Sequence, residues 1–255
     1  IKSSTGNYAQ LTAITDPTTG RINEIKVIKG GSGYVNGQTD IIITAPGLTA
    51  QVEAQIHPWQ INLFERNLIN IGSDDGIIEE NADHTSLQYG HLYAPRPLRE
   101  ATYAISGEAE DNTLYGTPDL VRDAESGVEV SSVNHSPILG WAHDGNPIYG
   151  PYGFTNNDGS GSIVEMKSGY ELKPNETNRP PLSLYPAGFF TEDYQFIGNG
   201  DLDKHNGRFA ITPDYPKGIY AYHATIKSQN DTTGPFENFR RPAFPYFIGA
   251  TYKSK

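Results

Sequence analysis

The chain has 255 residues, and its formal net charge at pH 7 is −11. It has no cysteine, which excludes disulfides, a thiol nucleophile and a thiolate metal site. The acidic balance argues against a nucleic-acid partner, and because no apolar run approaches the roughly 20 residues that span a bilayer, we expect no membrane insertion. The 27 glycines, 18 prolines and 16 tyrosines favour turns and strands, so the composition predicts a mainly β protein.

Residues 1–57 predict a small glycine-rich β module. Apolar and polar side chains alternate over residues 8–14 and 22–28, which predicts two strands joined by a turn at 16–20. Two more strands are expected at 41–45 and 49–56. The loop GGSGY, which ends at Tyr34, lacks the Lys-Ser/Thr pair of a phosphate-binding loop, and no helical pattern follows it, so its glycines indicate a structural turn.

Residues 58–105 predict a connector that is partly helical and partly extended. Apolar side chains recur at helical spacing between residues 58 and 70, with Pro58 in the favoured first turn. Residues 87–100 contain two prolines and several aromatic residues, which favours an extended segment. Residues 106–255 then predict a larger antiparallel β domain with long loops and a β-sandwich-like fold.

The segment HSPILGWAHDGNPIYGPYGF, residues 135–154, concentrates the unusual residues of this larger domain. Asp144-Gly145 tolerates positive φ, and Pro147 pushes the preceding residue toward an extended conformation, so a tight turn is expected there. The turn would place His143 and Asp144 at its mouth. The apolar anchors on either side of it would be Trp141, Ile148 and Tyr149.

A second segment, residues 201–225, carries a DxDxH cluster followed by two strands. The loop TPDYPKG separates those strands. Because side chains alternate along a strand, Tyr220 and Tyr222 should share one face, with Ala221 and His223 on the other.

These segments resemble the YHYH protein family over residues 131–250. The resemblance rests on three motifs in order, WAHDGNPIYGPYG, LDKHNGRFAITPDYPKGIYAYHAT and PAFPYFIG. The name-giving motif differs, because Ala221 stands where the first histidine of the family's tyrosine-histidine repeat is expected. An activity that needs both histidines would therefore lack one of them in this chain. The GGSGY pattern resembles a glycine-rich β-repeat of structural proteins in large tailed bacteriophages, and the combination resembles tail or baseplate proteins of T4-like, especially marine, phages.

Six residues are candidates for a divalent metal site. Imidazole and carboxylate together suit zinc, whereas carboxylates in glycine-rich turns suit calcium. The alternative is that the histidines brace turns through hydrogen bonds and the aspartates cap backbone amides. The candidates are His143, Asp144, Asp201, Asp203, His205 and His223. The sequence nominates no catalytic residue and no other cofactor.

Four tyrosines are candidates for a surface that stacks on a sugar, with core packing as the alternative. They are Tyr149, Tyr152, Tyr220 and Tyr222.

The resemblance implies a structural component of a phage virion, in the tail, baseplate or fibre, with a contribution to host-surface recognition. The expected partners are copies of itself, other tail or baseplate proteins and a host surface glycan, and the expected location is the extracellular virion. A metal-binding or metal-dependent extracellular enzyme is one alternative, favoured if His143, Asp203 and His223 converge on an ion. A carbohydrate-binding module is the other, favoured if the tyrosines form an exposed row.

Overall fold

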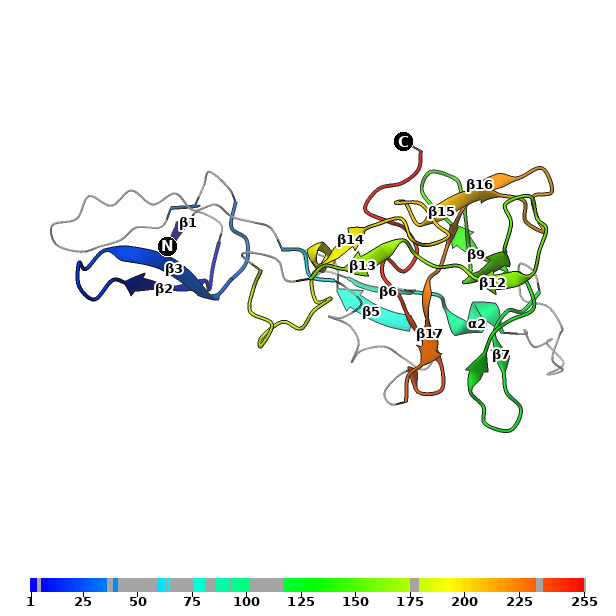
Figure 1. Cartoon of the computed structure of the whole chain (residues 1–255), viewed down its shortest axis with the longest axis horizontal. Coiled ribbons are helices and arrows are strands. Elements are labelled where there is room, and N and C mark those ends of the chain that lie inside the picture. The colour runs from blue at the N-terminus through cyan, green and yellow to red at the C-terminus, as the bar shows by residue number, and fades with distance from the viewer. Residues whose placement is uncertain are drawn as a thin grey trace. The chain divides into compact units, whose positions relative to one another are not determined.

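A computed structural model describes residues 1–3, 6–35, 39–40, 59–62, 64, 76–80, 86–91, 93–100, 117–174, 179–232 and 236–254 (Figure 1). The chain divides into two compact units. The first consists of Ile1–Gln60 and Thr177–Pro186, and the second of Ile61–Glu176 and Ala187–Lys255. The strands predicted at 41–45 and 49–56 lie outside the described residues.

The first unit is built on a β-hairpin. Strands β2 (Gln10–Thr15) and β3 (Ile22–Lys29) pair antiparallel, as the alternating pattern predicts. Asp16 closes the turn between them, because its Oδ1 accepts the backbone N–H groups of Thr18 and Thr19, both at 2.8 Å. The short strands β1 (Lys2–Ser3) and β4 (Thr39–Asp40) form a separate antiparallel pair.

The GGSGY loop is a structural turn. Gly31 has φ of +70°, and a Cβ atom there would lie 2.3 Å from the carbonyl oxygen of Asn7, so only glycine fits. Ser32 forms a β-bridge with Asn7, and the Tyr34 hydroxyl accepts the backbone N–H of Ala9 at 3.1 Å. The loop thereby ties residues 7–9 to the end of the hairpin.

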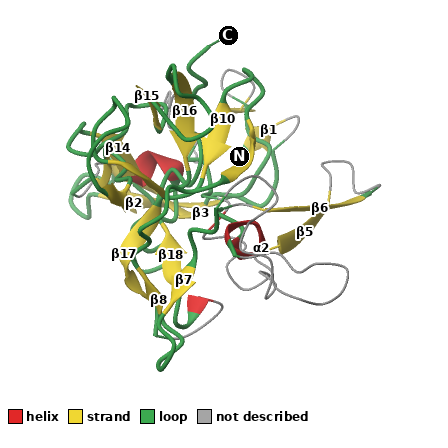
Figure 2. Ribbon diagram, turned by 90° about the vertical axis from the view of Figure 1, so that its right-hand side faces the viewer, coloured by secondary structure: helices red, strands yellow, loops and turns green. Residues whose placement is uncertain are grey.

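A four-stranded sheet in the order β15-β16-β10-β9 organises the second unit; Figure 2 labels three of its strands, β15, β16 and β10. Strands β15 and β16 pair antiparallel, as do β9 and β10, whereas β10 and β16 run parallel. This parallel pair places the two motif segments side by side in the sheet, Tyr149 opposite His223. The strands are β9 (Ile138–Trp141), β10 (Pro147–Tyr149), β15 (Gly207–Ala210) and β16 (Ile219–His223).

The other strands of the second unit form two-stranded antiparallel pairs. They are β5 (Gly76–Glu80) with β6 (Leu87–His91), β7 (Val121–Arg122) with β8 (Glu129–Val130), β11 (Tyr152–Phe154) with β12 (Ile163–Glu165), β13 (Tyr170–Leu172) with β14 (Tyr194–Phe196), and β17 (Ile226–Asn230) with β18 (Arg240–Pro242). A 3-10 turn, η2, spans Thr191–Asp193. The prediction of a mainly β, mostly antiparallel chain is confirmed, and the structure shows in addition that its sheets are small.

Two predictions in the connector need correction. Of the helix predicted at 58–70, the structure describes residues 59–62 and 64. Ile61 forms a β-bridge with Phe190 and residues 59–62 are not helical, whereas Phe64 is helical. Residues 87–100 are not extended throughout, because helix α2 occupies Arg96–Arg99. Its proline lies in the first turn, where a missing N–H is tolerated.

Aromatic side chains dominate the core of the second unit. Phe64, Tyr93 and Phe236 form one buried cluster, against which Tyr246 packs. Ile138, Tyr149 and Ala221 form a second cluster between neighbouring strands of the four-stranded sheet. Within the described ranges, no helix has the length and apolar character needed to cross a membrane.

Candidate functional site

The predicted turn at residues 144–147 is present and begins the candidate site. Gly145 has φ of +81°, and the Asp144 Oδ1 accepts the backbone N–H of Asn146 at 3.2 Å. Tyr149, on β10, is fully buried as an anchor. Trp141, predicted as a second anchor, is 51 % exposed, so its side chain is only partly buried.

The tyrosines of β16 each donate a hydrogen bond to a carboxylate from another segment. The Tyr222 hydroxyl donates to Asp144 at 2.6 Å, and the Tyr220 hydroxyl donates to Asp203 at 2.8 Å. The two rings contact edge to face, with centroids 5.4 Å apart. Burial raises the pKa of Tyr222 to about 12, and the bond to Asp144 adds to this effect, so the hydroxyl remains a donor at neutral pH.

Both carboxylates are held in the ionised form. Burial alone would raise the pKa of Asp203, but its bonds from Tyr220 and from the backbone amides of His205 and Gly207 bring that pKa below its ordinary value. The same holds for Asp144: its slight burial would raise its pKa, but the bonds that it accepts from the Tyr222 hydroxyl and from Asn146 and Ser254 together bring that pKa below its ordinary value. The arrangement therefore presents negative charge beside two phenol rings.

His223 lies on the opposite face of β16, as alternation predicts. Its side chain is 1 % exposed, its Nδ1 lies 3.1 Å from the carbonyl oxygen of Gly150, and its ring stacks on that of Tyr149. Burial, with His135 and Arg208 nearby, lowers the pKa of His223 to about 3. The ring is therefore neutral at physiological pH.

Ala221 lies on the same face as His223, in the buried cluster with Ile138 and Tyr149. It is 1 % exposed and packs in that cluster, so a larger imidazole ring would have to displace close-packed neighbours. In this chain an alanine that packs in the core therefore takes the place of the first histidine of the tyrosine-histidine repeat.

Restoring the motif with Ala221→His should overpack this cluster and lower the free energy of unfolding by about 1–3 kcal/mol. Urea denaturation would measure the change. Ala187→His is the matched control, because Ala187 is exposed and its replacement should have little effect. A variant as stable as the parent chain would show that the core can accommodate the second histidine.

The metal candidates lie in several places. His143 is exposed and contacts Tyr252, whereas His205 Nδ1 lies 2.8 Å from the carbonyl oxygen of Thr251. Asp201 accepts the backbone N–H of Lys167 at 2.9 Å. Among the described residues, which include all six candidates, no three histidine, aspartate or glutamate side chains gather as an ion would need. A metal site stays a prediction.

The tyrosines proposed for sugar stacking are mostly internal. Tyr149, Tyr152 and Tyr222 each have 0 % exposure, and Tyr220 is partly buried. The condition that favoured a carbohydrate-binding module, an exposed row of rings, is therefore not met in this structure.

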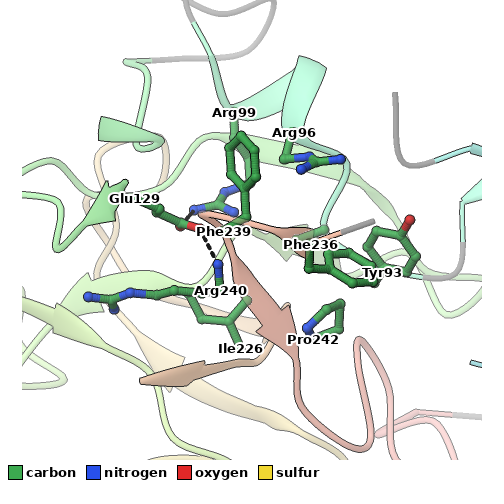
Figure 3. Close-up of a pocket in the computed structure, with 10 residues that line it drawn as sticks. Tyr93, Arg96, Arg99, Glu129, Ile226, Phe236, Phe239, Arg240 and Pro242 are labelled. Carbon is green, nitrogen blue, oxygen red and sulfur yellow. Dashed lines mark hydrogen bonds and ion pairs between the residues drawn. The ribbon is translucent and has the colours of Figure 1, made fainter. Parts of the chain in front are cut away.

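Sequence reasoning did not find a buried ionic network beside the site. Arg99, on α2, donates to Asp119 at 2.9 Å and to Glu129 at 3.0 Å. Glu129 in turn accepts the backbone N–H of Arg240 at 2.8 Å (Figure 3). The small cavity lined by the residues drawn in Figure 3 has room for about one water molecule. No local sequence signal marks this network, because its members come from four separate segments.

The Arg240 side chain connects this network to the motif segment. It donates to the Tyr152 hydroxyl at 3.0 Å and to Glu165 at 2.6 Å. Ser136 donates to Asp119 and accepts the backbone N–H of Tyr152 at 2.7 Å. The network thus fixes both ends of residues 136–152, which contain β9, the turn and β10.

Comparison with known families gives one match. The profile of the family described as YHYH protein matches residues 14–232. The match confirms the family resemblance seen in the first two motifs, ends before PAFPYFIG, and extends N-terminally into the glycine-rich hairpin. No curated protein matches the chain significantly, and no solved structure does so either.

Proposed function

The chain belongs to the YHYH protein family, and we propose that it is a structural component of a phage virion, in the tail, baseplate or fibre, which assembles with copies of itself. The observation that carries the assembly is an apolar face on the β2–β3 hairpin. The virion setting rests on the resemblance of the glycine-rich repeat and connector to phage tail proteins. Other tail proteins, and a glycan on the host surface, are the further partners that this setting implies.

The face consists of two cross-strand pairs of apolar residues. Leu11 pairs with Val27, and Ala13 pairs with Ile25. Val27 is 50 % exposed, and Leu11 and Ile25 are only partly buried. The opposite face of the hairpin is mixed, because Thr12 pairs with Lys26 there.

A two-stranded hairpin is marginally stable alone and needs packing against its apolar face. Because paired strands present side chains in register, the same face on a second copy could interdigitate with this one. Burying the exposed part of Val27 and its neighbours would contribute about 25 cal/mol for each Å² removed from water. The hairpin therefore supports a self-associating structural role.

Sedimentation of the full chain over a wide concentration range should show a homo-oligomer, and Val27→Asp should weaken its association at least tenfold, about 1.4 kcal/mol per interface. The cause is the desolvation of a carboxylate in an apolar contact. Thr12→Asp makes a similar change on the mixed face and should associate like the parent chain. A parent chain that is monomeric throughout, or equal effects of the two variants, would contradict the assembly role.

A further inference from the structure

Residues 251–254 lie on the surface formed by the motif segments, and each of them makes a specific contact. The surface, called here the tyrosine face, consists of Asp144, Asp203, His205, Tyr220 and Tyr222. Thr251 contacts His205 through its carbonyl oxygen at 2.8 Å and its hydroxyl at 3.0 Å. The Tyr252 ring contacts His143, at the rim of the face, with centroids 6.1 Å apart.

The tyrosine face binds the backbone of this segment through side chains. The backbone N–H of Lys253 donates to the Tyr222 hydroxyl at 2.7 Å, and the next N–H, of Ser254, donates to Asp144 at 3.2 Å. Tyr222 can serve both neighbours because its proton goes to Asp144 and a lone pair accepts from Lys253. Contacts of this kind recognise the peptide backbone, whatever its side chains.

The Lys253 side chain gives the contact its chemical selectivity. Its ammonium lies 3.4 Å from Asp203 and 4.9 Å from the centroid of the Tyr220 ring. A carboxylate beside an aromatic face is a favourable site for a cation. Because the face itself carries two ionised carboxylates, it favours a positively charged segment.

The groups of the tyrosine face are held by the domain itself. Asp144 is fixed by its own turn, where it accepts the N–H of Asn146. Asp203 accepts the N–H of His205 at 2.9 Å, and Tyr220 and Tyr222 extend from β16. Residues 251–254 are exposed and form no strand or helix, and the side chain of Lys253 is 46 % exposed. Such a segment can leave a preorganised surface at little cost to the core.

We propose that the tyrosine face is a binding site for a lysine-bearing peptide segment, and that residues 251–254 fill it in cis. The face lies within the family match and the segment lies beyond its end at residue 232. A partner would present the same chemistry, two consecutive backbone N–H groups with a lysine at the first of them. This site is separate from the hairpin face, so either proposal can fail without the other.

The test uses a fluorescent peptide, GATYKS, which has the sequence of residues 249–254, and the full chain. In the parent chain, residues 251–254 already occupy the tyrosine face. Because they belong to the same molecule, they compete with the added peptide at a high effective concentration, so the peptide should bind weakly. Lys253→Glu places a carboxylate against Asp203 and should release the segment, which raises the affinity for the peptide at least tenfold. Lys217→Glu, the same charge change at an exposed position of the β15–β16 loop, should leave the affinity unchanged.

Two further measurements test which groups of the peptide and of the tyrosine face make the contact. The peptide GATYES, which reverses the charge, should bind at least tenfold more weakly than GATYKS. The added change Asp203→Asn in the Lys253→Glu chain removes only the attraction of an exposed pair and should weaken the binding of GATYKS about threefold. In the unaltered chain, excess peptide should speed hydrogen exchange at the amides of Lys253 and Ser254, because it displaces them. Equal binding by the Lys253→Glu and Lys217→Glu chains, equal binding of the two peptides, or unchanged exchange would overturn the proposal.

Discussion

Replacing Arg99 with leucine is expected to lower the free energy of unfolding by about 3–5 kcal/mol. The side chains of Arg99, Asp119 and Glu129 are 2 %, 0 % and 1 % exposed, and the guanidinium bonds to both carboxylates. Leucine has a similar apolar volume but would leave both carboxylates buried without their cation. The cost comes from that uncompensated charge rather than from lost packing.

The behaviour of Asp119 shows how closely balanced the network is. Burial raises its pKa, although Arg99 and the Ser136 hydroxyl act in the opposite direction. Without the guanidinium, we expect Asp119 to take up a proton in the folded state at higher pH. The loss of stability in Arg99→Leu should therefore be smaller in mildly acidic buffer than at neutral pH.

Urea denaturation of Arg99→Leu and Arg122→Leu provides the measurement and its control. Arg122 pairs with Glu100 at the surface, where the two side chains are 47 % and 37 % exposed. Surface pairs of this kind contribute about 0–1 kcal/mol, so the control should change little. If both variants lose the same stability, the buried network does not hold the motif segment in place.

The features of the fold that the sequence predicted are those with local causes. The β2–β3 hairpin follows from alternation and from Asp16, whose side chain closes the turn within four residues. The separation of Tyr222 from His223 onto opposite faces of β16 follows from the two-residue period of a strand. In each case the residues that decide the structure are neighbours in the chain.

The features that were not predicted depend on contacts between distant segments. Arg99 is buried only because Asp119 and Glu129, 20 and 30 residues away, meet it, and an arginine by itself predicts exposure. The role of the tyrosine face is similar, because nothing in residues 201–225 indicates that Lys253 will lie on Tyr220. The metal hypothesis grouped His143 with His223, whereas β16 presents His223 to the opposite face from Asp144.

The free energy of unfolding should fall as the pH is lowered from 7.5 to 5, because the core contains two neighbouring histidines. The rings of His135 and His223 lie 6.3 Å apart, and each Nδ1 faces a carbonyl oxygen, of Ser136 and Gly150 respectively. Burial lowers both pKa values, and Arg208 contributes to lowering each. The bonds with the carbonyl groups of Ser136 and Gly150 partly oppose this effect, as does Asp214 at His135. Protonating either ring would place a second positive charge in a core that already holds the Arg208 guanidinium.

Stability falls at low pH because the folded and the unfolded states take up a proton at different pH values. An unfolded histidine titrates near pH 6.5, whereas folded His223 titrates near 3, so between these values the unfolded state binds more protons. Stability is therefore complete above pH 6.5 and is lost progressively as the pH falls toward 3. His223 alone should cost about 2 kcal/mol at pH 5, and His135 adds to this loss.

Urea denaturation at a series of pH values between 7.5 and 5 would measure this slope, in a range where the ordinary pKa values of carboxylates lie below the window. His223→Gln retains an N–H donor for Gly150 but cannot titrate, so its stability should depend less on pH than that of the parent chain, whatever its absolute value. His143→Gln, at an exposed position, should keep the parent slope. A parent chain of constant stability over this range, or His223→Gln with the parent slope, would show that His223 is not the neutral buried group that the fold requires.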